Sequence, residues 1–305
     1  MRGGFPDHPV LGGEHRGIVR PNATGSSDPK LSLLSGLAKV AASQTGTTCG
    51  IVVGGGVSCI GSNGFGLLGT GALADSSTPV TPVGLTSGVT DISLSTHSCV
   101  IRSGGLWCWG LNSFGQAGPT TSSTPVQVPG IVDAVSVKTT GSNTCVLHQS
   151  ATVSCLGSNF SGQLGTGALA TSSNTPLQVV GITGVTSLGM GNGRACATTV
   201  GGTLRCWGSG SPLPSTVPGI SNATKVVIGA AHICVLVSGG TVTCFGTDLS
   251  LIPVTGLSSV VDIESGDNSM CARTSTAAVY CWGSNSGGTL GDGTGFYFAP
   301  QKVVL

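Results

Sequence analysis

Hydrophobic and polar residues alternate with a period of two in a stretch that recurs along the chain. Its clearest copy runs from Cys99 to Gly118, where two apolar runs flank Ser103, Gly104 and Gly105. A short glycine-containing link between two such runs is typical of a β-hairpin. A glycine-rich segment follows the hairpin. The pattern therefore predicts a hairpin followed by a tight turn.

This unit occurs six times, and each copy carries two cysteines nine or ten residues apart. All twelve cysteines fall in these pairs: Cys49 and Cys59, Cys99 and Cys108, Cys145 and Cys155, Cys196 and Cys206, Cys234 and Cys244, Cys271 and Cys281. Successive first cysteines are 50, 46, 51, 38 and 37 residues apart. A period in this range indicates a solenoid, a propeller or another repeat array.

Both faces of the predicted hairpin are apolar. The cysteines share one face with residues such as Ile101 and Leu106, because strand side chains alternate. The opposite face carries a second set of apolar residues: Ile60, Trp109, Leu156, Trp207, Phe245 and Trp282. The hairpin is therefore expected to pack between two neighbours.

Two further strand-like stretches accompany each hairpin. Directly before it comes an apolar stretch such as 89–94, and before that a proline-led stretch such as 82–85 or 125–128. Proline suits an outer edge strand, where its missing N–H is not needed. Four strands in roughly 40–50 residues are typical of a β-propeller blade. A β-solenoid is the alternative, although its repeats are usually shorter.

We therefore predict an all-β chain. Residues 28–305 form one β-propeller of six hairpin-bearing blades, with four short antiparallel strands per blade, and residues 1–27 form a poorly ordered tail. Residues 299–305 look like the opening strand of a further repeat, and residues 28–33 look like another copy of it. Either one terminal strand completes the first or last blade, or a seventh blade is partial.

Three segments carry a family resemblance: Cys-Trp-Gly-Leu-Asn-Ser-Phe-Gly-Gln-Ala-Gly (108–118), Cys-Leu-Gly-Ser-Asn-Phe-Ser-Gly-Gln-Leu-Gly-Thr-Gly (155–167) and Cys-Trp-Gly-Ser-Asn-Ser-Gly-Gly-Thr-Leu-Gly-Asp-Gly-Thr (281–294). They resemble the repeat of the regulator of chromosome condensation family, here in a bacterial, cysteine-paired type. The resemblance implies a propeller, usually of seven blades. The family includes a nucleotide-exchange factor for a small GTPase, a secreted inhibitor of β-lactamases and bacterial surface proteins. The fourth and fifth repeats depart from the pattern, because they lack the glycine-rich turn.

Composition narrows the class of partner. The 305 residues carry a formal net charge of +1 with 8% charged residues, which gives no electrostatic reason to expect nucleic acid. No apolar run approaches the roughly 18 residues that span a bilayer, so we expect no membrane insertion. We expect a monomer that needs no cofactor.

The cysteine pairs predict disulfides. A two-residue turn at Ser103 and Gly104 places Cys99 opposite Cys108, and a three-residue turn or a bulge gives the same opposition at the ten-residue spacings. Alternatively, the cysteines are small buried apolar residues. Zinc is disfavoured by the spacing, so no metal site is predicted.

Disulfides indicate an oxidising compartment. We therefore expect an extracellular or cell-surface protein. Residues 1–29 show no signal-peptide pattern, which conflicts with that expectation. The true start lies upstream, the sequence is a fragment, or the protein is cytoplasmic.

Candidate binding residues are few. Phe65, Phe114 and Phe160 lie in the glycine-rich turns of three repeats, as binding anchors or as packing residues. Asp91, Asp133 and Asp262 share one predicted repeat position, filled elsewhere by Lys39, Thr186 and Lys225. They would line one end of a central channel or form a solvated ladder. None of the five histidines lies in a catalytic motif, so no catalytic residue is predicted.

The expected function is a secreted or surface-displayed scaffold that binds an unknown protein or glycan through the loops between blades. It is expected to have no catalytic activity of its own. The alternatives are an exchange factor for a small GTPase, which rests on the resemblance alone, and a secreted enzyme inhibitor. A propeller hydrolase is disfavoured by the scarcity of histidines and paired acids.

Overall fold

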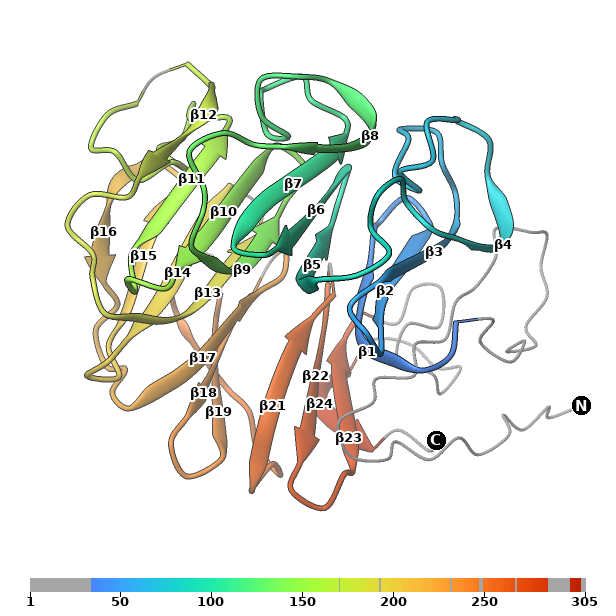
Figure 1. The fold of residues 1–305 in the computed structure, drawn as a ribbon. Coiled ribbons are helices and arrows are strands. Elements are labelled where there is room, and N and C mark those ends of the chain that lie inside the picture. Colours follow the sequence, from blue (N-terminus) through green and yellow to red (C-terminus); the bar gives the residue numbers. More distant parts are fainter. Residues whose placement is uncertain are drawn as a thin grey trace, which may run out of the picture.

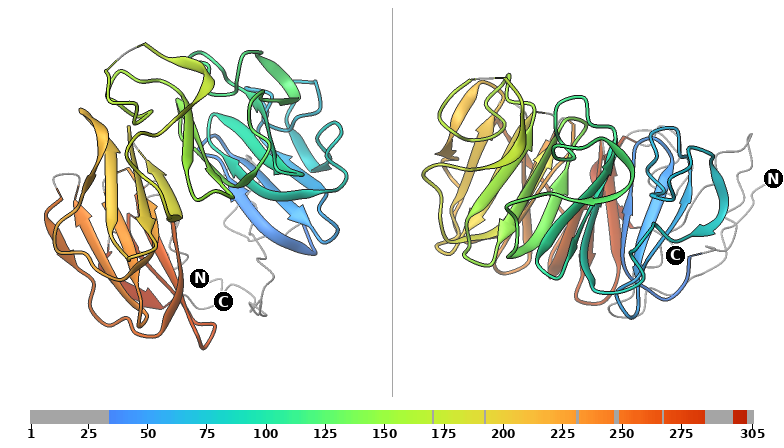
Figure 2. Two further views of the ribbon diagram at one scale, coloured as in Figure 1. Left: turned by 60° about the vertical axis from the view of Figure 1, so that its left-hand side comes forward. Right: turned by 45° about the horizontal axis from the view of Figure 1, so that its top comes forward.

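The computed structural model describes residues 34–169, 171–191, 193–230, 232–246, 249–266, 268–284 and 297–302. These residues form six four-stranded antiparallel sheets, and each sheet is built from consecutive strands (Figure 1). The sheets follow one another in sequence order as the blades of a β-propeller (Figure 2). The predicted fold class is therefore confirmed.

The strands take their order in each blade directly from the chain. Blades 1–3 contain β1 (Leu37–Ala42), β2 (Thr47–Val52), β3 (Val57–Gly61) and β4 (Ser76–Val80); β5 (Val89–Leu94), β6 (His97–Arg102), β7 (Gly105–Gly110) and β8 (Ser122–Gln127); β9 (Ala134–Thr139), β10 (Asn143–His148), β11 (Val153–Gly157) and β12 (Ser173–Gln178). Blades 4–6 contain β13 (Val185–Gly191), β14 (Arg194–Thr199), β15 (Leu204–Gly208) and β16 (Ser211–Thr216); β17 (Ala223–Ile228), β18 (His232–Val237), β19 (Thr241–Gly246) and β20 (Leu251–Pro253); β21 (Val260–Ser265), β22 (Ser269–Thr274), β23 (Val279–Gly283) and β24 (Tyr297–Lys302).

The second and third strands of every blade form the predicted hairpin, and their cysteines are directly opposed. All six pairs are disulfides, with Cα–Cα distances of 4.0–4.2 Å. In blade 2 the turn residues Ser103 and Gly104 both have positive φ, as a two-residue type I′ turn requires. In the chain-entropy model each bridge adds about 2.7 kcal/mol of stability.

From blade 1 to blade 6, neighbouring blades bury one apolar cluster at each of the five boundaries. In blades 1–5 the cysteine face of the hairpin meets the following blade, and in blades 2–6 the opposite face, with residues such as Trp109 and Trp207, meets the preceding one. Both predictions about the hairpin faces are thus confirmed. The first strands of successive blades also contact one another, so they form the inner wall of the propeller.

One strand prediction needs correction, and one of the two alternatives for the terminal strand is confirmed. The proline-led strand follows its hairpin as the fourth strand of the same blade, and in blade 1 this strand contains Pro79 while Pro82 lies in the next loop. At the other end, β24 pairs with β23 and completes blade 6. The predicted tail at 1–27 and residues 28–33 lie outside the described residues, so that domain boundary stays a prediction.

Candidate functional site

Among the described residues, three long connections lie at one end of the propeller. They join the third and fourth strands of blades 1–3 and span residues 62–75, 111–121 and 158–172. In blade 4 the same connection is only Ser209 and Gly210, because β15 ends at Gly208 and β16 begins at Ser211. The surface at this end therefore differs strongly between blade 4 and blades 1–3.

An asparagine at the start of each long connection organises the turn. The side-chain oxygens of Asn63, Asn112 and Asn159 accept hydrogen bonds from the backbone N–H five residues later, at 2.8, 2.8 and 3.1 Å. Their amide nitrogens donate to backbone carbonyls further along the loop. An amide can satisfy donors and acceptors at once, so it replaces the backbone pairing that an irregular loop lacks.

The same turns also form hydrogen bonds with the next blade. The carbonyl four residues after each asparagine accepts a hydrogen bond across the boundary. Trp109 Nε1 donates to Leu67 at 2.8 Å, Thr144 Oγ1 donates to Gln116 at 2.8 Å, and Trp207 Nε1 donates to Gln163 at 3.0 Å. The turns are thus rigidly positioned, which is what a binding surface requires.

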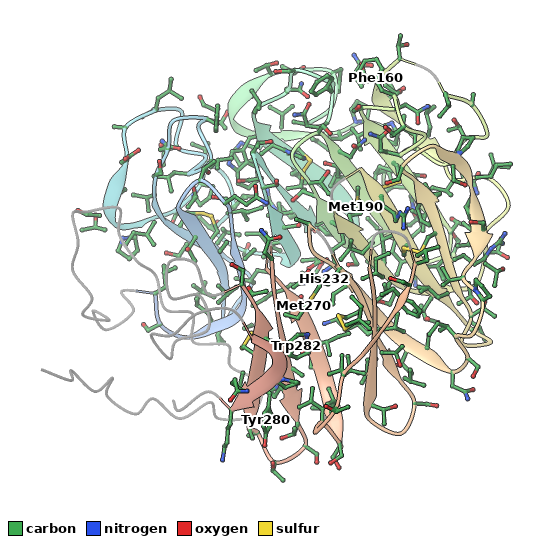
Figure 3. The ribbon with its side chains drawn as sticks, turned by 180° about the vertical axis from the view of Figure 1, so that it is seen from behind. Phe160, Met190, His232, Met270, Tyr280 and Trp282 are labelled. Atoms are coloured by element: carbon green, nitrogen blue, oxygen red, sulfur yellow. A yellow bond between two sulfur atoms is a disulfide. The ribbon has the colours of Figure 1, made fainter. Side chains whose placement is uncertain are left out.

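The three predicted phenylalanines stand on these turns and remain exposed. Phe65, Phe114 and Phe160 are 44%, 38% and 63% exposed, which is high for such apolar side chains. Phe65 and Phe114 follow their asparagine by two residues, whereas Phe160 follows by one. Phe114 and Phe160 meet edge to face with ring centroids 6.2 Å apart, and Figure 3 shows Phe160 at the loop end of the propeller. The structure thus brings two of the three rings together.

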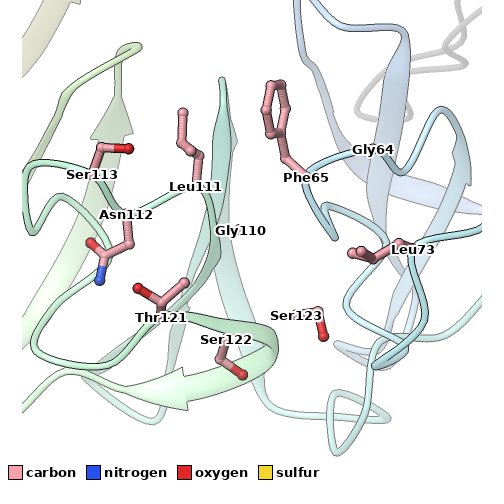
Figure 4. A pocket seen from close by; sticks show the side chains of 10 residues that line it. All are labelled: Gly64, Phe65, Leu73, Gly110, Leu111, Asn112, Ser113, Thr121, Ser122 and Ser123. Carbon is pink, nitrogen blue, oxygen red and sulfur yellow. The ribbon is translucent and has the colours of Figure 1, made fainter.

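Phe65 instead borders a pocket between blades 1 and 2 (Figure 4). The pocket has a volume of about 390 Å³. Phe65 and Leu73 line it from blade 1, and Leu111, Asn112 and Ser113 line it from blade 2. None of its ten lining residues is charged. This is a shallow, neutral site with apolar walls and a few hydroxyl and amide groups.

We group the exposed and half-buried apolar residues of the three turns as the apolar rim: Phe65, Leu73, Leu111, Phe114, Phe160 and Leu169. Sequence reasoning missed Leu73, Leu111 and Leu169. A single exposed leucine is common on protein surfaces, so nothing in the sequence marks these three as part of a patch.

The aspartates hold blades together. Asp91 on β5 is buried, and it forms an ion pair with Lys39 of blade 1 and accepts a hydrogen bond of 2.8 Å from the Val137 N–H of blade 3. Asp262 on β21 pairs with Lys225 at 2.7 Å, and Lys225 also contacts Glu264 at 2.6 Å. Burial works against the charged form of Lys225, but the two carboxylates outweigh it and raise its pKa.

The predicted shared position of the aspartates is wrong for Asp133. The residue of β9 that corresponds to Asp91 and Asp262 is Ser136, and in blade 4 it is Ser187 rather than Thr186. All first strands share a bulge near their start, so the mismatch lies in the sequence spacing: Asp133 comes 12 residues before Cys145, whereas Asp91 and Asp262 come 8 and 9 residues before Cys99 and Cys271. Asp133 lies just before β9 and contacts His148 instead. A binding role for the three aspartates stays a prediction.

Lys138 on β9 is a further charged residue of the inner wall that the first strands form. Lys39, Asp91, Lys225 and Glu264 all act on it electrostatically, yet it forms no ion pair with a described residue. Burial lowers its pKa.

Within the described ranges, no three histidine, cysteine or acidic side chains are grouped closely enough to hold a metal ion. The described part of the chain also has no helix long and apolar enough to cross a membrane.

Comparison with known proteins supports the repeat assignment. Residues 95–116 and 260–289 match the regulator of chromosome condensation (RCC1) repeat, which confirms the resemblance seen in the sequence. No curated protein matched the chain in a sequence search.

Solved structures share the fold at low identity. Human WBSCR16 aligns with a TM-score of 0.76 and 20% identity, over 88% of this chain and 82% of that one. Yeast RCC1 (Prp20), solved bound to Kap60, gives 0.74 and 18%, over 90% and 77%. The CRINKLY WD40 ectodomain of the Arabidopsis thaliana receptor kinase ACR4 gives 0.53 and 20%, over 80% of each chain. These likenesses show the fold alone.

Proposed function

We propose that this chain, whose repeats match those of the regulator of chromosome condensation family and build a six-bladed propeller, is a secreted or cell-surface binding scaffold. The apolar rim is its binding face. The observation that carries this proposal is the pairing of exposed phenylalanines with rigid turns on one end of blades 1–3. Binding at this face involves no catalytic step.

The proposed compartment rests on the cysteines. Six of six pairs are bridged, and the described residues contain no free cysteine. Disulfides persist in oxidising compartments and are rare in the cytosol. The plant receptor ectodomain with the same fold is an extracellular relative in architecture, which makes an exported role compatible with the fold.

The proposed partner is a protein or a glycan that presents a neutral, partly apolar surface. Charged groups are absent from the pocket beside Phe65, so an ionic partner would gain nothing there. Exposed aromatic rings can pack against apolar side chains or against the C–H face of a sugar. Aromatic residues of this kind often dominate the energy of an interface.

Exchange on a small GTPase remains the alternative function. It rests on the repeat family and on the fold shared with yeast RCC1, and fold alone does not transfer function. A secreted enzyme inhibitor is a special case of the binding scaffold.

The test uses the full, disulfide-bonded chain. It is screened against a glycan array and against purified surface proteins of the source cell, and each partner is then titrated against Phe65→Ala and Phe114→Ala. We expect at least a 10-fold loss of affinity in one of them. Val200→Ala is the matched control, because Val200 is an exposed apolar residue in a hairpin loop outside the rim.

Two results would overturn the proposal. One is an affinity that both phenylalanine variants leave unchanged. The other is a protein from the source cell whose thiols all react with an alkylating agent without prior reduction, because the chain would then reside in a reducing compartment.

A further inference from the structure

A serine, a histidine and an aspartate form a hydrogen-bonded chain on blade 3. His148 Nδ1 lies 2.6 Å from Asp133 Oδ1, and His148 Nε2 lies 2.9 Å from Ser154 Oγ. Asp133 comes just before β9, His148 ends β10 and Ser154 lies on β11. These are the distances at which a base can take a proton from a hydroxyl nucleophile.

The hydrogen bonds determine where the protons lie. An ionised carboxylate can only accept, so His148 Nδ1 must donate to Asp133. In the neutral ring Nε2 is then the unprotonated nitrogen, and it accepts from the Ser154 hydroxyl. The hydroxyl therefore points at the base, and the base is oriented by a third group. This is the arrangement of a Ser-His-Asp triad, which is recognised by geometry and not by sequence position.

The backbone holds the histidine and the aspartate in place. The Gln149 N–H donates to the Asp133 carbonyl at 2.8 Å, and the His148 N–H donates to the Thr152 carbonyl at 2.9 Å. Together these bonds fix the loop before β9 against the hairpin that carries the histidine.

The fold does not require this set of residues. In blade 2 the positions of His148 and Ser154 are occupied by Arg102 and Trp107, whose guanidinium lies 5.8 Å from the ring centroid. In the other blades the residues at the two positions are Val52 and Ser58, Thr199 and Arg205, Val237 and Thr243, Thr274 and Tyr280. Only blade 3 combines a histidine with a hydroxyl.

We propose that Asp133, His148 and Ser154 form a nucleophilic site that cleaves small acyl esters. The Asp133 side chain is 40% exposed and that of His148 10% exposed, so the site opens to solvent at its acidic end. A pocket of about 270 Å³ lies beside the loop before β9; Val132, the neighbour of Asp133, lines it with Arg102, Trp107 and Gln127, whereas Asp133, His148 and Ser154 do not. Ser154 itself is 9% exposed, so a short and slender acyl group is the substrate that fits.

The reaction follows from the proton positions. Ser154 Oγ attacks the ester carbonyl carbon while its proton moves to His148 Nε2, and the Asp133 carboxylate stabilises the resulting imidazolium. The C–O bond to the leaving alcohol then breaks, and the alcohol takes the proton from Nε2. Water attacks the acyl-serine by the same route, which releases the acid and restores the serine hydroxyl. No oxidant, reductant or metal is needed.

The first experiment is covalent labelling. The full disulfide-bonded chain is treated with a fluorophosphonate probe and measured by intact mass and peptide mapping. We expect one adduct, located on Ser154. The Ser154→Ala and His148→Gln variants should lose it, whereas Ser150→Ala should keep it, because the exposed Ser150 contacts Thr152 and not His148. Labelling at another residue, or labelling that survives His148→Gln, would overturn the proposal.

The second experiment is hydrolysis of p-nitrophenyl acetate. Ser154→Ala should fall to the uncatalysed rate, and Asp133→Asn should lower kcat by about 10⁴-fold or to that rate, because the amide favours the wrong imidazole tautomer. Thermal melting separates this role from a purely structural one. If the wild type is not labelled and hydrolyses no ester above Ser154→Ala, the chain of hydrogen bonds only stabilises the hairpin.

Discussion

Blades 3 and 4 share a hairpin, a disulfide and an outer strand, yet they differ at one connection. Blade 3 has a long glycine-rich turn after β11, whereas blade 4 passes from β15 to β16 through Ser209 and Gly210. The turn of blade 3 offers the Gln163 carbonyl to Trp207 of blade 4. Blade 4 offers no such turn, and blade 5 has Phe245, which carries no donor, at the position of the tryptophan. Turn and tryptophan therefore occur together at the boundary between blades 3 and 4, and both are missing at the boundary between blades 4 and 5.

This comparison separates two roles of the turn. Its backbone carbonyl accepts a hydrogen bond from the next blade, whereas its phenylalanine is exposed on the surface. A blade can lose both together without losing its core, as blade 4 shows. The proposed binding face, the apolar rim, lies on the turns of blades 1–3.

The largest effect is expected from Trp207→Ala. The side chain is almost fully buried between blades 3 and 4, so its removal should lower the free energy of unfolding by about 3–5 kcal/mol. Urea unfolding followed by circular dichroism measures the change. If the free energy of unfolding falls by less than about 1 kcal/mol, Trp207 does not hold blades 3 and 4 together as described.

The second prediction concerns pH and the residue two places before the first cysteine, which is His97 in blade 2 and Asn143 in blade 3. His97 Nε2 lies 2.6 Å from Thr144 Oγ1, and its Nδ1 is buried without a partner among the described residues. Burial lowers the pKa of His97 from 6.5 to about 3. The folded protein keeps this ring neutral while the unfolded chain protonates.

Stability should therefore fall as the pH drops from 6.5 towards 3, by about 1.4 kcal/mol for each pH unit in that window. The matched variant is His97→Asn, which copies blade 3 and should remove this part of the pH dependence. Urea unfolding at pH 7 and pH 4.5 gives the comparison. If the free energy of unfolding changes equally between pH 7 and pH 4.5 in the wild type and in His97→Asn, burial does not lower the pKa of His97.

A smaller effect is expected from exchanging the aromatic residues. Phe245→Trp places an indole N–H at a boundary where no glycine-rich turn supplies a carbonyl, which should cost about 1–3 kcal/mol. The reciprocal Trp207→Phe leaves the Gln163 carbonyl unpaired and should cost about 1–3 kcal/mol. If Phe245→Trp is neutral while Trp207→Phe is not, the match between turn and tryptophan does not extend to blade 5.

The smallest effect is expected in the hairpin loops. Ala151 has a φ of 58°, a conformation that favours glycine, and Gly202 holds the same place in blade 4 with a φ of 71°. Ala151→Gly should stabilise the chain by up to about 1 kcal/mol, because the strain of alanine exceeds the added entropy of the unfolded chain. Gly202→Ala should destabilise it, since a Cβ there would meet the Asn222 backbone. Differential scanning calorimetry resolves both shifts.

The fold was predictable because the spacing of the cysteines indicates how the two strands of each hairpin pair. Two cysteines that oppose each other in every copy place both hairpin strands at once, and the alternation then assigns both faces. The outer strand was harder, since prolines occur both in β4 and in the loop after it. Asp133 was misplaced because the turn between the first and second strands varies in length from blade to blade, so counting residues along the repeat does not identify the paired position.

The candidate sites were less predictable than the fold. Phe65, Phe114 and Phe160 could be found because the turn repeats, but their exposure and the contact between two of them depend on how neighbouring blades pack. The contact of Asp133, His148 and Ser154 joins three segments that share no motif. Such a constellation exists only once the strands are paired.

The close opposition of each cysteine pair also bears on how the chain matures. Eight cysteines already allow 105 pairings, and twelve allow far more. Here every bridge lies within one hairpin and closes a segment of nine or ten residues. A bridge can form as soon as its own hairpin has folded, before the blades meet. A chain that crosses a membrane unfolded could therefore be oxidised repeat by repeat as it emerges, with little opportunity for the wrong partners to meet.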